Sequence, residues 1–182
     1  CNAGSTSLKF KLYEMPECVV LSTGKVERVG SADDAIFNYV NVQKNVRIDL
    51  DKQNIPDYKT GIEKYLGYLT TGENKVLSSI EEIERVGYKS VLSKDHYGVH
   101  IIDESVMNGM REFFDLAPVH NSAYLNAIET VKSVLPNALH VGVFETAFHK
   151  DIPLERKIYG IPYEWYETYG IQRLGYHGAS HG

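Results

Sequence analysis

Four short segments of this chain combine residue types that can do chemistry on an anion. The first reads N-A-G-S-T-S-L-K, from Asn2 to Lys9, and holds one glycine, three hydroxyl side chains and a lysine. Backbone N–H groups beside a glycine can approach a phosphate closely, hydroxyls add donors, and lysine adds a positive charge. Asn, Gly and Ser also form ordinary hairpin turns. The segment lacks the G-x-x-x-x-G-K pattern of a P-loop, so by itself it favours a turn over a phosphate site.

The second segment reads V-F-E-T-A-F-H and covers residues 143–149. Glu145 follows directly on a predicted buried strand, and α/β sheets usually bind their ligands at such strand ends. This carboxylate could orient or deprotonate a nucleophile or hold a cation, and His149 could assist it. A solvated glutamate and a packed or surface histidine explain the same residues equally well.

Histidines mark the other two segments. In Q-R-L-G-Y-H-G-A-S-H-G, residues 172–182, His177 and His181 stand four positions apart between glycines. No glutamate separates them as in the zinc-binding H-E-x-x-H motif. A histidine between glycines suits a hydrogen-bond donor to a developing charge, although a tight turn explains it too. In A-P-V-H-N, residues 117–121, Val119 and His120 could line a small pocket or cap a helix.

Composition argues against several classes of protein. The 182 residues contain 24 acidic and 19 basic side chains, a net charge of −5, and no basic patch, so we expect no nucleic-acid partner. No apolar run approaches the ~18 residues of a membrane span. The two cysteines, Cys1 and Cys18, have no metal-ligand spacing, which favours a reduced, cytoplasmic setting. Because the chain begins at Cys1 and ends inside a motif, we expect a fragment that carries part of a site.

Alternating apolar and polar residues predict a series of antiparallel strands near the start of the chain. The patterns cover residues 8–15, 18–29 and 38–50. Gly24 is a possible β-bulge in the second strand. The short intervals between the patterns indicate a meander.

Helical spacing replaces this alternation after residue 56. Asp57 is a plausible N-cap for a helix whose apolar face comprises Ile62, Tyr65, Leu66 and Leu69. Residues 80–86 prolong or follow this helix. Two more helices and two short buried strands are predicted at residues 103–116, 120–135, 86–92 and 139–144. A meander followed by alternating strands and helices indicates an α/β architecture with a mixed sheet flanked by helices.

Together the four segments, in this order and at this spacing, are similar to the acetate kinase family. The likeness extends over essentially the whole chain through Y-E-M-P, G-K-V-E-R-V-G and I-P-Y-E-W-Y-E-T-Y-G-I. The resemblance implies a ribonuclease H-like fold of the actin and sugar kinase superfamily. It also implies that residues 1–182 form the amino-terminal acyl-substrate and phosphate-loop domain of a two-domain kinase. The opening strand and the carboxy-terminal nucleotide-binding domain of such an enzyme would be absent from this sequence.

The activity implied by the resemblance is reversible phosphoryl transfer from ATP to acetate, which gives acetyl phosphate and ADP. The implied cofactor is Mg²⁺, with Mn²⁺ as a substitute, and the implied full-length protein is a cytoplasmic homodimer. We expect the fragment alone to be inactive because it lacks the adenosine site. Two alternatives stay open: a propionate or butyrate kinase of the same family, and a catalytically weak relative that binds a ligand or a partner.

Site residues carry over from the family's motifs position by position. Glu145 and His177 match catalytic residues, His177 being the one that stabilises the transferring phosphoryl group, and Asn2 matches the magnesium-site asparagine. The implied phosphate loop comprises Ser5, Ser7 and Lys9. The implied acetate site comprises Lys89, Val91, Val119 and His120, with the two valines beside the methyl group.

Two positions depart from the family's pattern. The usual F-D-T-A-F-H has Glu145 in place of aspartate, which keeps the charge on a side chain one methylene longer. The usual G-H-R-V-V-H-G-G reads G-Y-K-S-V-L-S-K here, so Tyr88 replaces a histidine and Lys89 replaces the substrate-binding arginine. Lysine keeps the charge but lacks the fork that holds a planar carboxylate with two hydrogen bonds. The sequence therefore predicts an altered acyl site.

Overall fold

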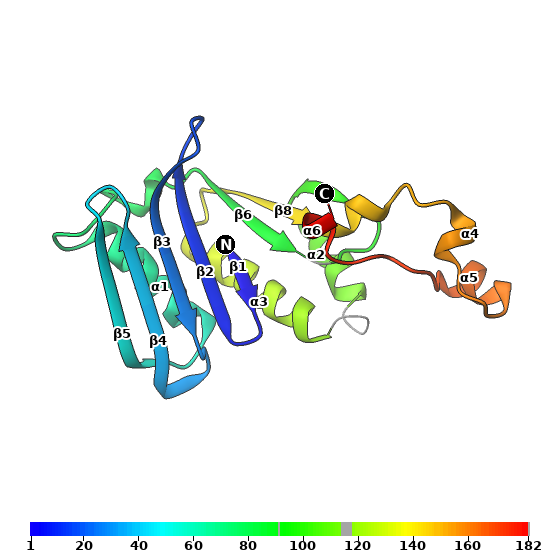
Figure 1. Cartoon of the computed structure of the whole chain (residues 1–182), viewed down its shortest axis with the longest axis horizontal. Coiled ribbons are helices and arrows are strands. Elements are labelled where there is room, and N and C mark those ends of the chain that lie inside the picture. Colours follow the sequence, from blue (N-terminus) through cyan, green and yellow to red (C-terminus); the bar gives the residue numbers. More distant parts are fainter. Residues whose placement is uncertain (91, 114–117, 182) are drawn as a thin grey trace.

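The computed structural model describes residues 1–90, 92–113 and 118–181 and contains two sheets (Figure 1). The first is a five-stranded antiparallel meander in chain order, formed by β1 (Asn2–Gly4), β2 (Ser7–Glu14), β3 (Val19–Glu27), β4 (Ser31–Asn41) and β5 (Val46–Ile55). The second has three strands in the order β6 (Arg85–Ser90), β8 (Leu139–Phe144) and β7 (Gly98–Ile101). Strand β6 is parallel to β8, and β7 is antiparallel to it. The predicted α/β class with a mixed sheet is therefore confirmed.

The meander confirms two of the predicted strands and corrects the third. Residues 38–50 were expected to form one strand, but they cover the end of β4, a turn and the start of β5. Asn45 adopts a left-handed backbone with φ 53°, and the Asn41 side chain accepts a hydrogen bond from Lys44 N at 2.9 Å. Asparagine favours both features, and they reverse the chain where weak alternation alone predicted continuity.

Gly24 is not the site of a bulge, contrary to the prediction. It pairs with Phe10 in regular register, and the irregularity between β2 and β3 lies between Leu12 and Tyr13. Gly24 instead leaves room for the Tyr65 ring, because a Cβ at this position would lie 2.4 Å from a ring carbon. Tyr65 in turn stacks on Phe10 with ring centroids 4.5 Å apart. The glycine therefore allows a helix to pack closely on the sheet.

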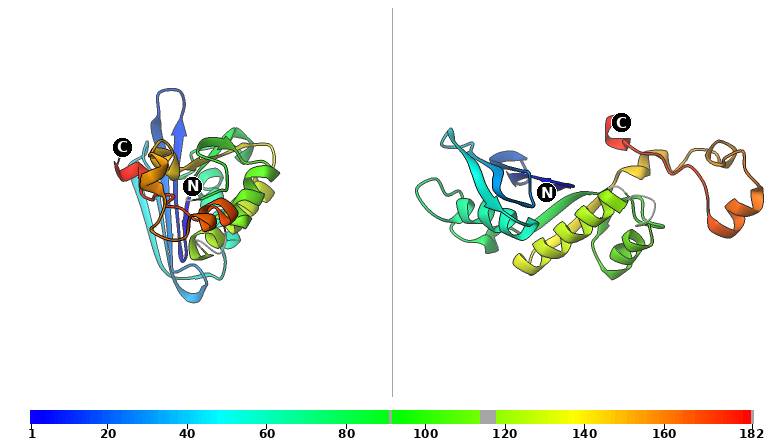
Figure 2. Two further views of the ribbon diagram at one scale, coloured as in Figure 1. Left: turned by 90° about the vertical axis from the view of Figure 1, so that its right-hand side faces the viewer. Right: turned by 90° about the horizontal axis from the view of Figure 1, so that it is seen from below.

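Helix α1 (Tyr58–Thr70) begins where the sequence predicted, because Asp57 Oδ1 accepts a hydrogen bond from Thr60 N at 2.7 Å. Residues 80–86 do not prolong it: a single 3-10 turn, η1 (Ile80–Glu82), is followed by β6. The other two predicted helices are α2 (Glu104–Glu112) and α3 (Pro118–Val134). Helices α1 and α3 lie on one side of the strands (Figure 2), the side to which Leu8, Phe10 and Val26 point from the sheet.

The two sheets meet at the first residue of the chain. Cys1 N donates to Gly87 O at 2.7 Å, and Cys1 O accepts from Lys89 N at 3.3 Å. These two bonds flank Tyr88 in the manner of a parallel strand pair. Strand β6 therefore lies beside β1, and residues from both sheets can line one surface.

Beyond β8 the chain forms a 3-10 helix, η3 (Glu145–His149), and then an arm that extends from the rest of the protein (Figure 1). The arm carries α4 (Leu154–Lys157) and α5 (Tyr163–Tyr169) and returns to η3 at α6 (Gly178–His181). Strand β7 and these short helices were not predicted. Strand β7 shows no buried residue, with Val99 70% and Ile101 59% exposed, so no hydrophobic pattern marks it. None of the helices in the described parts of the chain combines the length and the apolar character needed to cross a membrane.

A buried hydrogen-bond chain joins β6, β8 and the segment after α3. His140 Nε2 lies 3.0 Å from Leu135 O, which can only accept, so this nitrogen carries the proton. His140 Nδ1 then accepts from the Tyr88 hydroxyl at 2.8 Å. Burial lowers the pKa of His140 below its ordinary value. The folded protein therefore holds this imidazole neutral.

We predict that acid weakens the fold through His140. Below pH ~6.5 an unfolded imidazole binds a proton while the folded one stays neutral, so the free energy of unfolding falls as the pH decreases. Urea denaturation at several values between pH 8 and pH 5 measures this slope. His140→Gln should be less stable at pH 8 but should show a shallower decline. Equal slopes in the two proteins would contradict the prediction.

We predict opposite effects for two glycine substitutions. Gly24→Ala should lower the free energy of unfolding by about 1–3 kcal/mol because the Tyr65 ring must move. Gly67→Ala is the matched control, since a Cβ at this helical position meets nothing within 4 Å. It should raise stability by about 0.5–1 kcal/mol by restricting the unfolded chain. Urea denaturation of both variants tests the pair, and a stable Gly24→Ala protein would show that the stacked rings do not need this space.

Candidate functional site

The segment N-A-G-S-T-S-L-K forms a tight β-hairpin. Asn2 pairs with Lys9, Ala3 with Leu8 and Gly4 with Ser7, which leaves Ser5 and Thr6 as the turn. The turn that the sequence favours is therefore confirmed, and the strand after it begins at Ser7 rather than at Leu8. Directly opposed residues of an antiparallel pair share a face of the sheet. Asn2 and Lys9 accordingly lie side by side.

The turn itself is fixed from outside the hairpin. The Tyr58 hydroxyl, at the start of α1, lies 3.0 Å from the Ser5 carbonyl oxygen and also reaches the carbonyl of Gly4. Ser5 is exposed and lines a small cavity of about 300 Å³ together with Tyr58 and Asn126. Ser7 is half-buried and lines neither this cavity nor the groove described next. Neither serine of the loop lines the groove that contains Lys9.

An open groove of about 670 Å³ is lined by β1, β2 and β3 of the meander and by β6 and the end of β8 of the mixed sheet. Of the predicted site residues, it brings together Asn2, Lys9, Lys89 and Glu145. These four come from β1, β2, β6 and the start of η3. The parts of the chain that carry them are separated by up to 143 positions in the sequence and are joined here by the contact between β1 and β6.

An ion pair lies at one end of the groove. Lys89 stands opposite Val143 in the parallel pairing of β6 and β8, and Glu145 follows two residues later. Lys89 Nζ lies 2.8 Å from Glu145 Oε1. The glutamate side chain is only 9% exposed, whereas half of the lysine side chain is accessible. The neighbouring carboxylate raises the pKa of Lys89, which keeps this ammonium group charged.

The Glu145 carboxylate is suited to hold a hard cation. Its buried Oε1 makes the ion pair with Lys89 but has no other partner among the described residues. Mg²⁺ prefers oxygen ligands and commonly takes one or two carboxylates, with phosphate and water supplying the rest. The Asn2 amide in the same groove adds a further oxygen. In residues 1–90, 92–113 and 118–181 no cluster of three or more His, Cys, Asp or Glu side chains could bind a metal alone, so the ligand would have to complete the shell.

His177 does not line the groove, but its backbone is held against the same turn as Glu145. It has a left-handed backbone with φ 58° and an exposed side chain. The next residue, Gly178, touches η3 so closely that a Cβ would lie 2.0 Å from Glu145 O. The glycine that follows His177 is therefore required by packing.

His149 anchors the segment on the other side of His177. Its Nε2 lies 2.9 Å from Tyr176 O, and a Cβ at Gly175 would lie 2.3 Å from the imidazole ring. Gly175 also has φ 79°, a left-handed conformation that glycine adopts at little cost. His149 is thus a tether for the His177 segment. The glycines around the histidine, which suggested a loop aimed at a charge, are explained by these contacts.

The positions of three predicted acyl-site side chains are not described by the structure. Val91 lies outside the described residues, and Val119 and His120 fall in the first turn of α3, where the structure describes the backbone but not these side chains. Tyr88 was considered part of the altered acyl site. Its hydroxyl is instead bonded to buried His140, and the residue is 2% exposed. The replacement at position 88 therefore places a hydroxyl in the core, although Tyr88 also borders the groove.

The groove residues that the sequence analysis does not single out include Lys11, Thr23 and Lys25, whose side chains can contact an anion. The alternation L-K-F-K already places Lys9 and Lys11 on one face of a strand, so Lys11 could have been found. Thr23 and Lys25 lie on β3 opposite Lys11 and Lys9. Only the register between two strands reveals them.

The chain matches known proteins along its whole length. The match to the Acetokinase family covers residues 1–182. An acetate kinase from Bacillus mycoides is 42% identical over 181 residues, and one from Bacillus subtilis is 40% identical over 182 residues. Each alignment covers 99% of this chain and 44% of the relative. The chain therefore spans less than half the length of these relatives.

Solved structures agree with the sequence match. The crystal structure of an acetate kinase from Porphyromonas gingivalis superposes with a TM-score of 0.87 at 32% identity, over 99% of this chain and 45% of that one. A propionate kinase from Francisella tularensis gives a TM-score of 0.86 at 26% identity, over 99% and 44%. Since the family match extends from the first residue to the last, the chain belongs to the acetokinase family.

Proposed function

We propose that this chain is the acyl-substrate and phosphate-loop domain of a kinase that transfers a phosphoryl group reversibly between ATP and acetate. One observation carries the proposal: a single groove gathers Asn2, Lys9, Lys89 and Glu145 from both sheets. The names of the relatives, acetate kinases and a propionate kinase, support the same reaction class. The nucleotide-binding half would come from the part of the relatives that this chain does not cover.

Each groove residue has a role that its position supports. The Lys89 ammonium group would bind the carboxylate of acetate, and Lys9 would bind a phosphate oxygen of the donor. Asn2 and Glu145 would hold Mg²⁺, which when bound neutralises charge on the phosphates. Acetate is already ionised at pH 7, so the transfer needs no general base. Phosphoryl transfer depends mainly on positioning and charge stabilisation, and His177 would donate to the oxygens of the transferring group.

A longer acyl substrate is the second candidate, since a propionate kinase superposes about as well as an acetate kinase. The predicted contacts to the acyl chain, Val91 and Val119, decide between these substrates.

A catalytically weak relative is the third candidate. It is favoured by the Lys89–Glu145 contact, because a substrate carboxylate must compete with Glu145 for the ammonium group. The use of Mn²⁺, the cytoplasmic location and the homodimer stay predictions.

A chimaera tests the proposal directly. The matched segment of the Bacillus subtilis relative is replaced by this chain, and acetyl phosphate is trapped as the hydroxamate. We expect product that depends on both ATP and acetate from the chimaera and none from residues 1–182 alone. Glu145→Gln and His177→Ala in the chimaera should each lower kcat about 100-fold, the usual effect of losing a charge-stabilising group.

The folded state of each protein is checked by circular dichroism and thermal unfolding. A folded chimaera that phosphorylates neither acetate nor propionate nor butyrate would overturn the proposal in favour of the weak relative. Near-normal rates from Glu145→Gln or His177→Ala would remove the roles assigned to those residues. Activity on propionate that exceeds activity on acetate would select the second candidate.

We predict that Lys89 sets the affinity for the carboxylate substrate. Lys89→Ala in the chimaera should raise KM for acetate about tenfold or more, because a charge-assisted hydrogen bond is lost. Lys89→Arg should restore or improve KM, since the guanidinium fork can bind a carboxylate with two hydrogen bonds. Lys94→Ala is the matched control, because Lys94 is equally exposed and pairs with Glu112 outside the groove. An unchanged KM in Lys89→Ala would place acetate elsewhere.

A further inference from the structure

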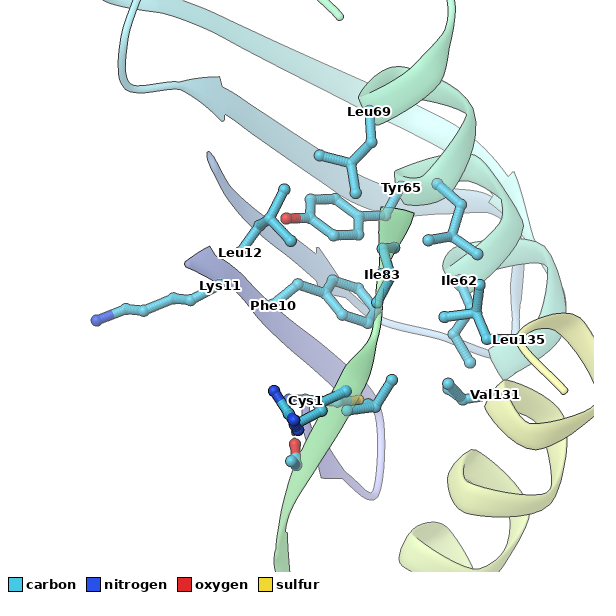
Figure 3. A pocket seen from close by; sticks show the side chains of 14 residues that line it. Cys1, Phe10, Lys11, Leu12, Ile62, Tyr65, Leu69, Ile83, Val131 and Leu135 are labelled. Atoms are coloured by element: carbon cyan, nitrogen blue, oxygen red, sulfur yellow. Dashed lines mark hydrogen bonds between the residues drawn. The ribbon is translucent and has the colours of Figure 1, made fainter. Parts of the chain in front are cut away.

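Three lysines share the outer face of β2 and β3. Lys9 and Lys11 are two residues apart on β2, while Phe10 between them points into the core. Lys25 on β3 stands directly opposite Lys9. Figure 3 shows the same division at Lys11, whose side chain points away from Phe10, Leu12 and the other apolar residues. We call Lys9, Lys11 and Lys25 the lysine triad.

The lysine triad makes the groove positive in an acidic protein. Its three ammonium groups and that of Lys89 line the groove, where Glu145 is the one carboxylate among the described lining residues. The chain as a whole has a net charge of −5. A cleft lined by one sign of charge concentrates counter-ions. The groove therefore attracts anions although the protein repels them.

The arrangement of the lysine triad has a cost in the free protein. Like charges directly opposite each other on neighbouring strands repel, which lowers the free energy of unfolding. Glu27 relieves part of this repulsion, since Glu27 Oε1 lies 2.8 Å from Lys25 Nζ. Within the described parts of the chain, no carboxylate lies within 4.0 Å of the Lys9 or Lys11 ammonium group. Glu27 also attracts Lys9, but from a greater distance, so among the described residues neither ammonium group is paired with a carboxylate at contact distance.

We propose that the lysine triad binds a phosphoanhydride chain, that is, two or more linked phosphates. Residues two apart on a strand are separated by about 6.6 Å, and opposed residues by about 5 Å. Flexible lysine stems spread over these distances suit several linked anionic groups better than one compact anion. The inference rests on the proposed function for Lys9 and adds Lys11 and Lys25 as binding residues. The linked phosphates could belong to a nucleoside triphosphate or to free polyphosphate.

Calorimetric titration of residues 1–182 tests this inference with four probes: tripolyphosphate, pyrophosphate, inorganic phosphate and ATP. We expect affinity to increase with the number of linked phosphates. We also expect it to fall as the salt concentration rises, because exposed charges are screened. ATP and tripolyphosphate of equal affinity would show that only the phosphate chain is bound. Tighter binding of ATP would identify the nucleotide as the source of the phosphates.

Variants assign the binding to the triad. Lys11→Ala and Lys25→Ala should each weaken tripolyphosphate binding about three- to tenfold, the effect of removing one charge-assisted contact. Lys25→Arg should preserve the affinity. Lys59→Ala is the control, because Lys59 is an exposed lysine on α1, outside the groove. Circular dichroism confirms that each variant is folded, which is expected because the side chains point away from the core.

Equal affinity for phosphate and tripolyphosphate would overturn the inference. So would Lys11→Ala and Lys25→Ala proteins that bind like the Lys59→Ala control. These outcomes are separable from the fate of the proposed function. The hydroxamate assay on the chimaera reports phosphoryl transfer, whereas calorimetry on this chain reports the phosphate chain alone.

Discussion

The parallel pairing of β6 with β8 is the constraint on which the candidate site depends. It sets Lys89 opposite Val143, so the chain that leaves β8 enters η3 with Glu145 beside the lysine. A slip of one residue would turn Lys89 to the other face of the sheet, because successive side chains point in opposite directions. The hydrogen bond between Tyr88 and His140 joins the same two strands inside the core. A buried polar contact that fits one register helps to exclude the other.

The two sheets supply different electrostatics to one groove. The mixed sheet contributes Lys89, and the turn after it, η3, contributes Glu145; these two side chains largely neutralise each other at 2.8 Å. The meander contributes positive charge that the described carboxylates do not fully balance. A carboxylate ligand would therefore meet a competitor in contact with Lys89, whereas among the described residues no carboxylate contacts the Lys9 ammonium group and Glu27 acts on it only from a greater distance. A phosphate could therefore bind at Lys9 without breaking an ion pair, whereas a carboxylate at Lys89 would have to displace Glu145.

Local patterns predicted the parts of the fold that local chemistry decides. Asp57 caps α1 as expected, the N-A-G-S-T-S-L-K hairpin forms, and Glu145 follows β8. The predictions were wrong where the local structure depends on residues that are distant in the sequence or on a turn that the apolar pattern does not reveal. The 38–50 strand was broken by the turn after Asn41, and Gly24 serves Tyr65, a residue 41 positions away. The Lys89–Glu145 pair likewise depends on a register that no local pattern contains. The resemblance to the acetate kinase family pointed to each of these two residues, but it did not predict that they form an ion pair.

The arm between η3 and α6 is a closed loop, with both ends fixed on the same short helix. Its outgoing and returning segments are joined where Arg173 N donates to Lys157 O at 2.8 Å and the Arg173 guanidinium lies over the Tyr159 ring. At the base, His149 holds Tyr176 and Gly178 rests on Glu145 O. A force applied to the tip of the arm is therefore transmitted to the backbone on either side of His177.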